Sequence, residues 1–184
     1  MTDRLNSSHE QASGARRLRL RSYTLADETA ARAANESMKS DGSLFLLDWN
    51  ETTQWPQWLK TINEHRRGLS LSVGLVPAVQ LVADVDGDIV GSVRVRFSLN
   101  KELERTGGHI GYGVLPAQRR RGYATEILSQ ALVVARSQGV DRVLVTCFED
   151  NAASARVIEK CGGVLEDVIT IEHDARGLRR YWIE

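Results

Sequence analysis

The hydrophobic pattern along the chain predicts short strands that alternate with amphipathic helices. Residues 18–22, Leu-Arg-Leu-Arg-Ser, alternate between apolar and polar side chains, as expected of a strand with one buried face. In residues 122–138 the apolar side chains instead recur every three or four positions, which is typical of a helix packed on one side. The almost continuously apolar run at residues 142–148 predicts a strand that is buried on both faces.

These patterns predict one strand, two helices, three strands, a helix, a strand, a helix and two strands. We expect strands at residues 18–22, 76–84, 88–98, 109–114, 142–148, 164–173 and 178–183, and helices at 24–39, 53–68, 122–138 and 151–160. Residues 86–88 and 174–177 predict the turns of two hairpins. Arg94 and Arg96 alternate with valines, which predicts a solvent-exposed face on their strand. The order of elements indicates an α/β or α+β domain with a mixed sheet.

Composition places the chain among ordinary globular domains and excludes several partners. The 184 residues suffice for one domain at residues 18–184, after a polar, flexible tail at residues 1–17. Lys+Arg and Asp+Glu both number 24, so no overall charge favours nucleic acid or an anionic membrane. The absence of a long apolar run and the presence of only two cysteines predict a cytoplasmic protein. Exposed sheet edges leave pairing into a homodimer open.

A loop at the start of the third predicted helix is the strongest candidate for a binding site. The strand before it ends at Val114, Pro116 prevents its continuation, and three consecutive arginines lead into the helix through Gly122. This arrangement combines free backbone N–H groups, the positive end of a helix dipole and guanidinium groups. It therefore predicts a site for a phosphorylated ligand.

Two motifs in this region resemble those of the GNAT superfamily of N-acetyltransferases. The run Val114-x-Pro-x-x-Arg119-x-x-Gly122-x-Ala124 resembles the acetyl-CoA loop of that family, Gln/Arg-x-x-Gly-x-Gly/Ala. Asn151-x-x-Ser154-Ala, followed by Lys-Cys-Gly at 160–162, resembles its second conserved block. The order of elements agrees over roughly residues 18–184, whereas the specific motifs lie between residues 109 and 163. The resemblance implies a mostly antiparallel seven-stranded sheet with about four helices, splayed between strands four and five.

The resemblance also implies acetyl-CoA as co-substrate, no metal, and a set of residues around the co-substrate. Gly122 would let the backbone approach the pyrophosphate, and the N–H of Val114 would polarise the thioester carbonyl. The implied acetyl-CoA-binding residues are Val114, Leu115, Arg119, Arg120, Arg121, Gly122, Tyr123, Ala124, Thr125, Asn151 and Ser154. The implied reaction is direct attack of a primary amine, on a small molecule or a peptide N-terminus, within a ternary complex.

The catalytic residues follow less directly from the motifs. Many family members have a tyrosine acid seven residues after the asparagine, where this chain has Ile158, so Ser154 becomes the substitute candidate. In this respect the chain is similar to the ribosomal-protein alanine acetyltransferase branch. His109 is the candidate base because imidazole titrates near neutral pH. Strand parity opposes this role unless a glycine bulges the strand, and a structural histidine is the alternative.

Several alternatives stay open from the sequence alone. The apolar segment 41–50 either lines a pocket or covers the core, and the same two readings apply to Trp49, Trp55 and Trp58. Small apolar roles are favoured over nucleophilic ones for Cys147 and Cys161. The weaker candidates for the base are Glu149, Glu166, Glu172 and His173. The alternative to an enzyme is a non-catalytic CoA-binding or sensing domain.

Overall fold

The computed structural model describes residues 17–40, 45–171 and 174–184. The predicted tail at 1–17 lies outside the described residues except for its last position. Glu172 and His173, two of the weaker base candidates, also lie outside them, as does part of the apolar segment 41–50.

The order of elements agrees with the predicted order throughout the described residues. The strands are β1 (Leu18–Arg21), β2 (Ala78–Val85), β3 (Asp88–Arg96), β4 (Ile110–Val114), β5 (Val143–Phe148), β6 (Val164–Ile171) and β7 (Asp174–Ile183). The α-helices are α1 (Glu28–Lys39), α2 (Trp55–Arg66), α3 (Tyr123–Ser137) and α4 (Ala152–Lys160). Short helical turns occur at Leu25–Asp27, Leu103–Gly107 and Pro116–Gln118.

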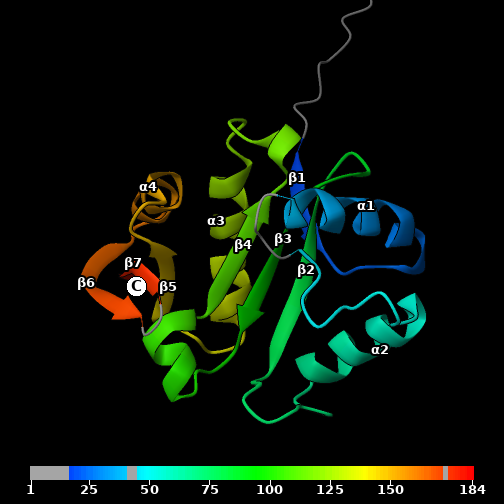
Figure 1. Ribbon diagram of the computed structural model, residues 1–184, viewed down its shortest axis with the longest axis horizontal. Coiled ribbons are helices and arrows are strands. Elements are labelled where there is room, and N and C mark those ends of the chain that lie inside the picture. Colours follow the sequence, from blue (N-terminus) through cyan, green and yellow to red (C-terminus); the bar gives the residue numbers. More distant parts are fainter. Residues whose placement is uncertain (1–16, 41–44, 172–173) are drawn as a thin grey trace, which may run out of the picture.

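The strands form two antiparallel sheets rather than one continuous sheet. The first has the order β1-β2-β3-β4 and the second the order β5-β7-β6. Helices α1 and α2 lie on one side of the four-stranded sheet, while α3 lies on the other side, towards α4 (Figure 1). The predicted α/β fold with seven strands is therefore confirmed in the described part of the chain.

The two sheets meet at one end of β4 and β5. The N–H of His109 donates to the carbonyl of Leu144 over 2.7 Å, and the N–H of Leu144 donates to Nδ1 of His109 over 2.9 Å. A Cβ on Gly108 would lie 2.6 Å from the Leu144 carbonyl oxygen, so the close approach requires glycine there. In the described residues no ladder joins β4 to β5 beyond this point. The predicted splay between strands four and five is confirmed.

The core divides into one cluster on each side of the four-stranded sheet. The cluster beneath α3 combines valines of β2 and β3 with the apolar face of α3. The other cluster centres on Trp55 and Trp58, whose rings stack at 4.7 Å and are almost completely buried. Their indole N–H groups donate to the carbonyls of Thr24 and Leu47, which satisfies the buried donors. These two tryptophans are core residues.

Two sequence predictions about strand faces and turns were wrong. Arg94 does not lie on a solvent-exposed face, because the segment after residue 44 and the α1–α2 layer cover that side of β3, and the residue is only 7% exposed. Residues 174–177 are not a turn but begin β7, where Gly177 pairs with Thr170 of β6.

The outer edge of the smaller sheet is formed by β6, which exposes several apolar side chains. Val164, Leu165 and Val168 are among the exposed large hydrophobic residues. Pairing of two chains through a sheet edge stays a prediction. None of the described helices combines the length and apolarity needed to cross a bilayer.

Candidate functional site

The entry to α3 is shaped by a proline and a glycine. Pro116 starts a short helical turn directly after β4, and its missing N–H stops the sheet ladder at that point. Gly122 has a φ of +84°, a left-handed conformation that is unstrained only for glycine, and it is the residue from which α3 begins. The intervening arginines are therefore held in a tight loop against the N-terminus of α3.

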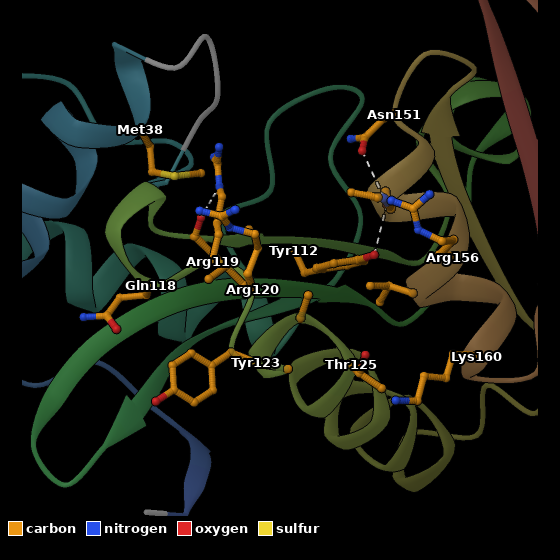
Figure 2. Close-up of a pocket in the computed structure, with 17 residues that line it drawn as sticks. Met38, Tyr112, Gln118, Arg119, Arg120, Tyr123, Thr125, Asn151, Arg156 and Lys160 are labelled. Carbon is orange, nitrogen blue, oxygen red and sulfur yellow. Dashed lines mark hydrogen bonds between the residues drawn. The ribbon is translucent and has the colours of Figure 1, made fainter.

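A cavity of about 710 Å³ lies where β4 and β5 diverge, between this loop and α4. Its walls come from the end of β4, the arginine loop, the first turn of α3 and one face of α4 (Figure 2). We call it the first cavity. The residues that line it are Met38, Tyr112, Gly113, Val114, Gln118, Arg119, Arg120, Gly122, Tyr123, Ala124, Thr125, Asn151, Ala153, Ser154, Arg156, Val157 and Lys160.

Backbone groups of β4 and α3 face this cavity without partners in the described chain. The N–H of Leu115 donates to Val90 on β3, and backbone groups alternate in direction along a strand, so the N–H of Val114 points into the gap. The N–H groups of Tyr123 and Ala124 lie in the first turn of α3, where no intrahelical acceptor exists. The first cavity thus has main-chain donors at both of its ends.

Arg119 stabilises the end of β4 from within the cavity. Its Nε donates to the carbonyl oxygen of Val114 over 3.2 Å. This hydrogen bond satisfies the Val114 carbonyl, which has no partner strand on the gap side. The Nε atom of Arg119 therefore binds the main chain and not a phosphate. The rest of the guanidinium group still lines the cavity.

Cations surround the cavity from two directions. Arg119 and Arg120 lie on the loop side, and Arg156 and Lys160 project from α4 on the opposite side (Figure 2). Arg156 and Lys160 are four residues apart and therefore share a face of α4. No carboxylate or imidazole lines the cavity among the described residues. The first cavity is suited to an anionic ligand.

Tyr112 joins β4 to α4 across the gap. Its hydroxyl lies 3.0 Å from Oγ of Ser154, and either oxygen can donate (Figure 2). Ser154 is fixed in turn because its backbone N–H donates to Oδ1 of Asn151, the N-cap of α4. Burial raises the pKa of Tyr112 to about 12, so the phenol keeps its proton at neutral pH. The pair places a hydroxyl donor inside the first cavity.

Most of the acetyl-CoA-binding residues predicted from the sequence come together here. Those that line the first cavity are Val114, Arg119, Arg120, Gly122, Tyr123, Ala124, Thr125, Asn151 and Ser154. Leu115 instead packs against the cluster around the tryptophans. Arg121 is exposed and lines neither cavity described here.

His109, the predicted base, lies at the closed end of the splay and not in either cavity. Its Nδ1 accepts the Leu144 N–H, and burial together with the charge of Arg96 lowers its pKa. β4 pairs with β3 in a regular register, so neither of its glycines bulges the strand. The geometry matches the structural alternative, a histidine that fastens β4 to β5.

None of the remaining candidates that the structure describes lines the first cavity. Glu149 is exposed, and Glu166 forms an ion pair with Arg180 at 2.8 Å. Burial raises the pKa of Cys147 and of Cys161, which disfavours their thiolate forms. Within the described residues, no group of three or more His, Cys, Asp or Glu is arranged to hold a metal ion.

Sequence reasoning missed Tyr112, Arg156 and Lys160. Tyr112 is two residues before Val114, and strand parity places both side chains on the same face, so that signal was available. The spacing of Arg156 and Lys160 on the helix that follows Asn151 was a second signal. The tyrosine hydroxyl comes from β4, whereas position 158 of α4 is an isoleucine.

A second, smaller cavity of about 350 Å³ opens on the α1–α2 side of β3 and β4. Tyr112 and Gly113 line both cavities, so the two adjoin at the end of β4. Gly111 adds no side chain, and a Cβ there would meet no atom within 4 Å. The residues that line the second cavity are Tyr23, Phe45, Leu47, Gln80, Ser92, Val93, Arg94, Arg96, Gly111, Tyr112 and Gly113.

Comparison of the sequence with protein families decides the assignment. Residues 17–164 match the family described as acetyltransferase (GNAT) domain, which is well over half of the chain. The chain belongs to the GNAT acetyltransferase family. The superfamily expected from the two motifs is thereby confirmed. A search of curated proteins found no match.

Solved structures with the same fold include several acetyltransferases. RimJ from Mycobacterium smegmatis, in complex with CoA-disulfide, is 18% identical with a TM-score of 0.66, covering 90% of this chain and 81% of RimJ. The acetyltransferase yncA from Salmonella typhimurium, with acetyl-CoA, is 17% identical with a TM-score of 0.61, covering 91% and 93%. RimL, a ribosomal L7/L12 alpha-N-protein acetyltransferase, is 22% identical with a TM-score of 0.60, covering 90% and 88%.

Proposed function

We propose that this GNAT protein transfers the acetyl group of acetyl-CoA to a primary amine by direct attack in a ternary complex. The observation that supports this most directly is the first cavity, which lies in the splay and combines main-chain donors with four cationic side chains. The structural relatives yncA and RimJ hold acetyl-CoA and CoA-disulfide. RimL acts on an α-amine of a protein, as its name states.

The two ends of the first cavity suit the two ends of acetyl-CoA. The N–H groups at the start of α3 and the side chain of Arg120 would hold the pyrophosphate, because a helix N-terminus and guanidinium groups both favour phosphate. Arg156 and Lys160 add positive charge on the α4 side. The pantetheine arm would lie along β4 in the gap that no partner strand fills.

The reacting thioester would lie beside Val114. The N–H of Val114 points into the gap and would donate to the thioester oxygen, stabilising the negative charge that forms on it in the tetrahedral intermediate. The amine nitrogen forms a bond to the carbonyl carbon as this charge develops. The C–S bond then breaks, the amide remains on the acceptor, and CoA leaves as a thiolate that takes up one proton.

Tyr112 is the residue best placed to supply a hydrogen bond to the departing sulfur. It lies two residues before Val114 on the same face of β4, and its hydroxyl is oriented by Ser154. With a pKa of about 12 it remains protonated throughout the physiological range. Since no carboxylate or imidazole of the described chain lines either cavity, the proton of the attacking amine leaves through water.

Release of free thiol from acetyl-CoA, measured across a panel of amines, tests the proposal. Acceptor-dependent thiol release with a matching N-acetylated product is the expected result. Tight binding of acetyl-CoA with no turnover on any amine, amino acid, aminoglycoside or peptide would instead support a CoA-binding or sensing domain.

A further inference from the structure

The second cavity contains two arginines whose charges are not balanced by carboxylates of the described residues. Arg94 is only 7% exposed, and Arg96 is half-buried two residues further along the same face of β3. The carboxylate nearest to Arg94 is that of Asp48, whose Oδ2 lies 3.3 Å from an Nη atom of the guanidinium. In the part of the chain that the structure describes, two guanidinium groups thus share one carboxylate, which leaves a net positive charge in a partly enclosed space.

Arg94 also has an unused hydrogen-bond donor. Its Nε is fully buried and has no hydrogen-bond partner among the described residues. Burying such a donor without an acceptor costs free energy, so a native structure that retains one commonly uses it to bind something. Since a guanidinium has donors but no acceptor, the missing partner is a hydrogen-bond acceptor, a role that a carboxylate oxygen can fill.

Arg96 contributes the second part of the site. One of its Nη atoms donates to the carbonyl of Gly108 over 3.0 Å, which anchors the side chain beside the cavity. Burial and the neighbouring charge of Arg94 lower the pKa of Arg96 to about 10, an indication that the pair lacks sufficient negative charge. An anion between the two guanidinium groups would remove this repulsion.

Two other polar side chains of the cavity already have partners. Nε2 of Gln80 donates to the carbonyl of Leu47, and Oγ of Ser92 donates to that of Phe45. The remaining donors are those of the two arginines and the buried hydroxyl of Tyr23, which has no hydrogen-bond partner among the described residues. Phe45 and Leu47 provide apolar surface on the opposite wall. The cavity offers donors at one end and an apolar surface beside them.

We propose that the second cavity binds the carboxylate of the acetyl acceptor between Arg94 and Arg96, so that the acceptor is an amino acid or another short amino carboxylate. This inference rests on the proposed acetyltransferase function. The volume of about 350 Å³ suits a small molecule. Arg94 pairs with Gly111 across the β3–β4 ladder. Gly113, which borders both cavities, lies two residues further along β4, so about 7 Å separates it from Gly111. A short carbon chain can connect a carboxylate at the first position to an amine at the second.

Matched substrates test the inference with the unaltered protein. Leucine, leucinamide and 3-methylbutylamine differ mainly in the presence of the carboxylate, and 4-aminobutanoate and 6-aminohexanoate lengthen the spacing. Thiol release should favour the best amino carboxylate over its amide by about 100-fold or more in kcat/KM, because a site built around buried donors rejects ligands that leave them unpaired. A preference for the amides, the plain amines or spermidine would overturn the inference. Thiol release with 2-aminoethylphosphonate, compared with that of the amino carboxylates, shows whether the site prefers a carboxylate or a phosphonate.

Substitution of Arg94 provides a second test of the carboxylate site. Arg94→Met keeps most of the side-chain volume and should lower kcat/KM for the amino carboxylate about 100-fold, while Arg94→Lys should restore part of it. Arg66→Met, on the exposed face of α2, is the matched control and should leave turnover unchanged. An equal kcat/KM in Arg94→Met and the control would contradict the role of Arg94.

Two binding measurements separate this inference from the proposed function. Calorimetric titration of acetyl-CoA should give the same Kd for the unaltered protein and Arg94→Met, because Arg94 does not line the first cavity. Titration of the amino carboxylates into the CoA-saturated protein reports on the second cavity without turnover. Binding that depends on Arg94 without acetyl transfer would support the carboxylate site and refute the transferase proposal. Acetyl transfer to acceptors without a carboxylate, with no binding of amino carboxylates, would support the transferase proposal and refute the carboxylate site.

Discussion

Removal of one hydroxyl from Tyr112 tests how the thioester is cleaved. In the proposed reaction this hydroxyl donates to the sulfur as negative charge develops on it. A hydrogen bond to a charged group is worth about 1.5–3 kcal/mol, and every 1.4 kcal/mol changes a rate about tenfold. Tyr112→Phe should therefore lower kcat by about 10- to 100-fold. The Kd for acetyl-CoA should change by less than about threefold, because the ring and the rest of the cavity remain.

The bond between Tyr112 and Ser154 refines this prediction. Oγ of Ser154 lies 3.0 Å from the phenol and orients it, so Ser154→Ala should lower kcat by only about 3- to 10-fold. In the double variant the loss should equal that of Tyr112→Phe alone, because Ser154 acts through Tyr112. Steady-state thiol release at saturating acetyl-CoA measures all three values.

Tyr181→Phe is the matched control for the loss of a phenol hydroxyl. The Tyr181 hydroxyl also forms a hydrogen bond, to Glu159 over 3.1 Å, but it lines neither cavity. Its removal should cost about 1 kcal/mol of stability and leave kcat unchanged. A kcat for Tyr112→Phe within twofold of the unaltered protein would refute the assigned role, as would additive effects in the double variant.

Three further predictions concern stability and the acceptor side. His109 has a lowered pKa in the folded state, whereas an unfolded histidine titrates near 6.5, so its contribution to stability is present above about pH 6.5 and is lost as pH falls below it. Urea unfolding from pH 8 to 5 should show this decline, and His109→Asn should flatten it; identical pH profiles would contradict the assignment. Gly111→Val places methyl groups in open space, so the melting temperature and the acetyl-CoA Kd should stay unchanged while acceptor KM rises at least about tenfold; an unaltered KM would show that the acceptor lies elsewhere. Trp58→Ala empties a fully buried site and should lower the free energy of unfolding by about 3–5 kcal/mol in urea titrations, and a loss below about 1 kcal/mol would contradict its place in the core.

The order of helices and strands could be predicted because it depends on local patterns. The alternation at residues 18–22 and the helical spacing at 122–138 each identify an element from its own side chains. The conformation of Gly122 could be predicted as well, because a glycine between an arginine-rich loop and a helix predicts the left-handed conformation that the structure has. The acetyl-CoA loop motif could be recognised from the sequence because its residues are also close neighbours along the chain.

The burial of Arg94 and the role of His109 could not be predicted locally. Whether the polar face of β3 meets solvent depends on α1, α2 and the segment after residue 44, all distant in the sequence. His109 finds its partner, Leu144, 35 residues later, and only the folded geometry brings the two together. Alternation defines which side chains share a face, but it does not say what covers that face.

The contact between Tyr112 and Ser154 could not be predicted either, since Ser154 lies 42 residues away on α4. Parity with Val114 could place the tyrosine on the correct face of β4. The width of the gap between β4 and α4, which decides whether the two hydroxyls meet, is a property of the whole domain.

Calorimetric titration of acetyl-CoA is the most direct test of the central claim, that the splay between β4 and β5 holds the acetyl donor by main-chain groups. The unaltered protein should bind with micromolar Kd. Gly122→Glu should abolish binding, because it forces a side chain into a left-handed position at +84° and places a negative charge at the start of α3. An unchanged Kd in Gly122→Glu, in a variant that keeps the circular dichroism spectrum of the unaltered protein, would contradict the account.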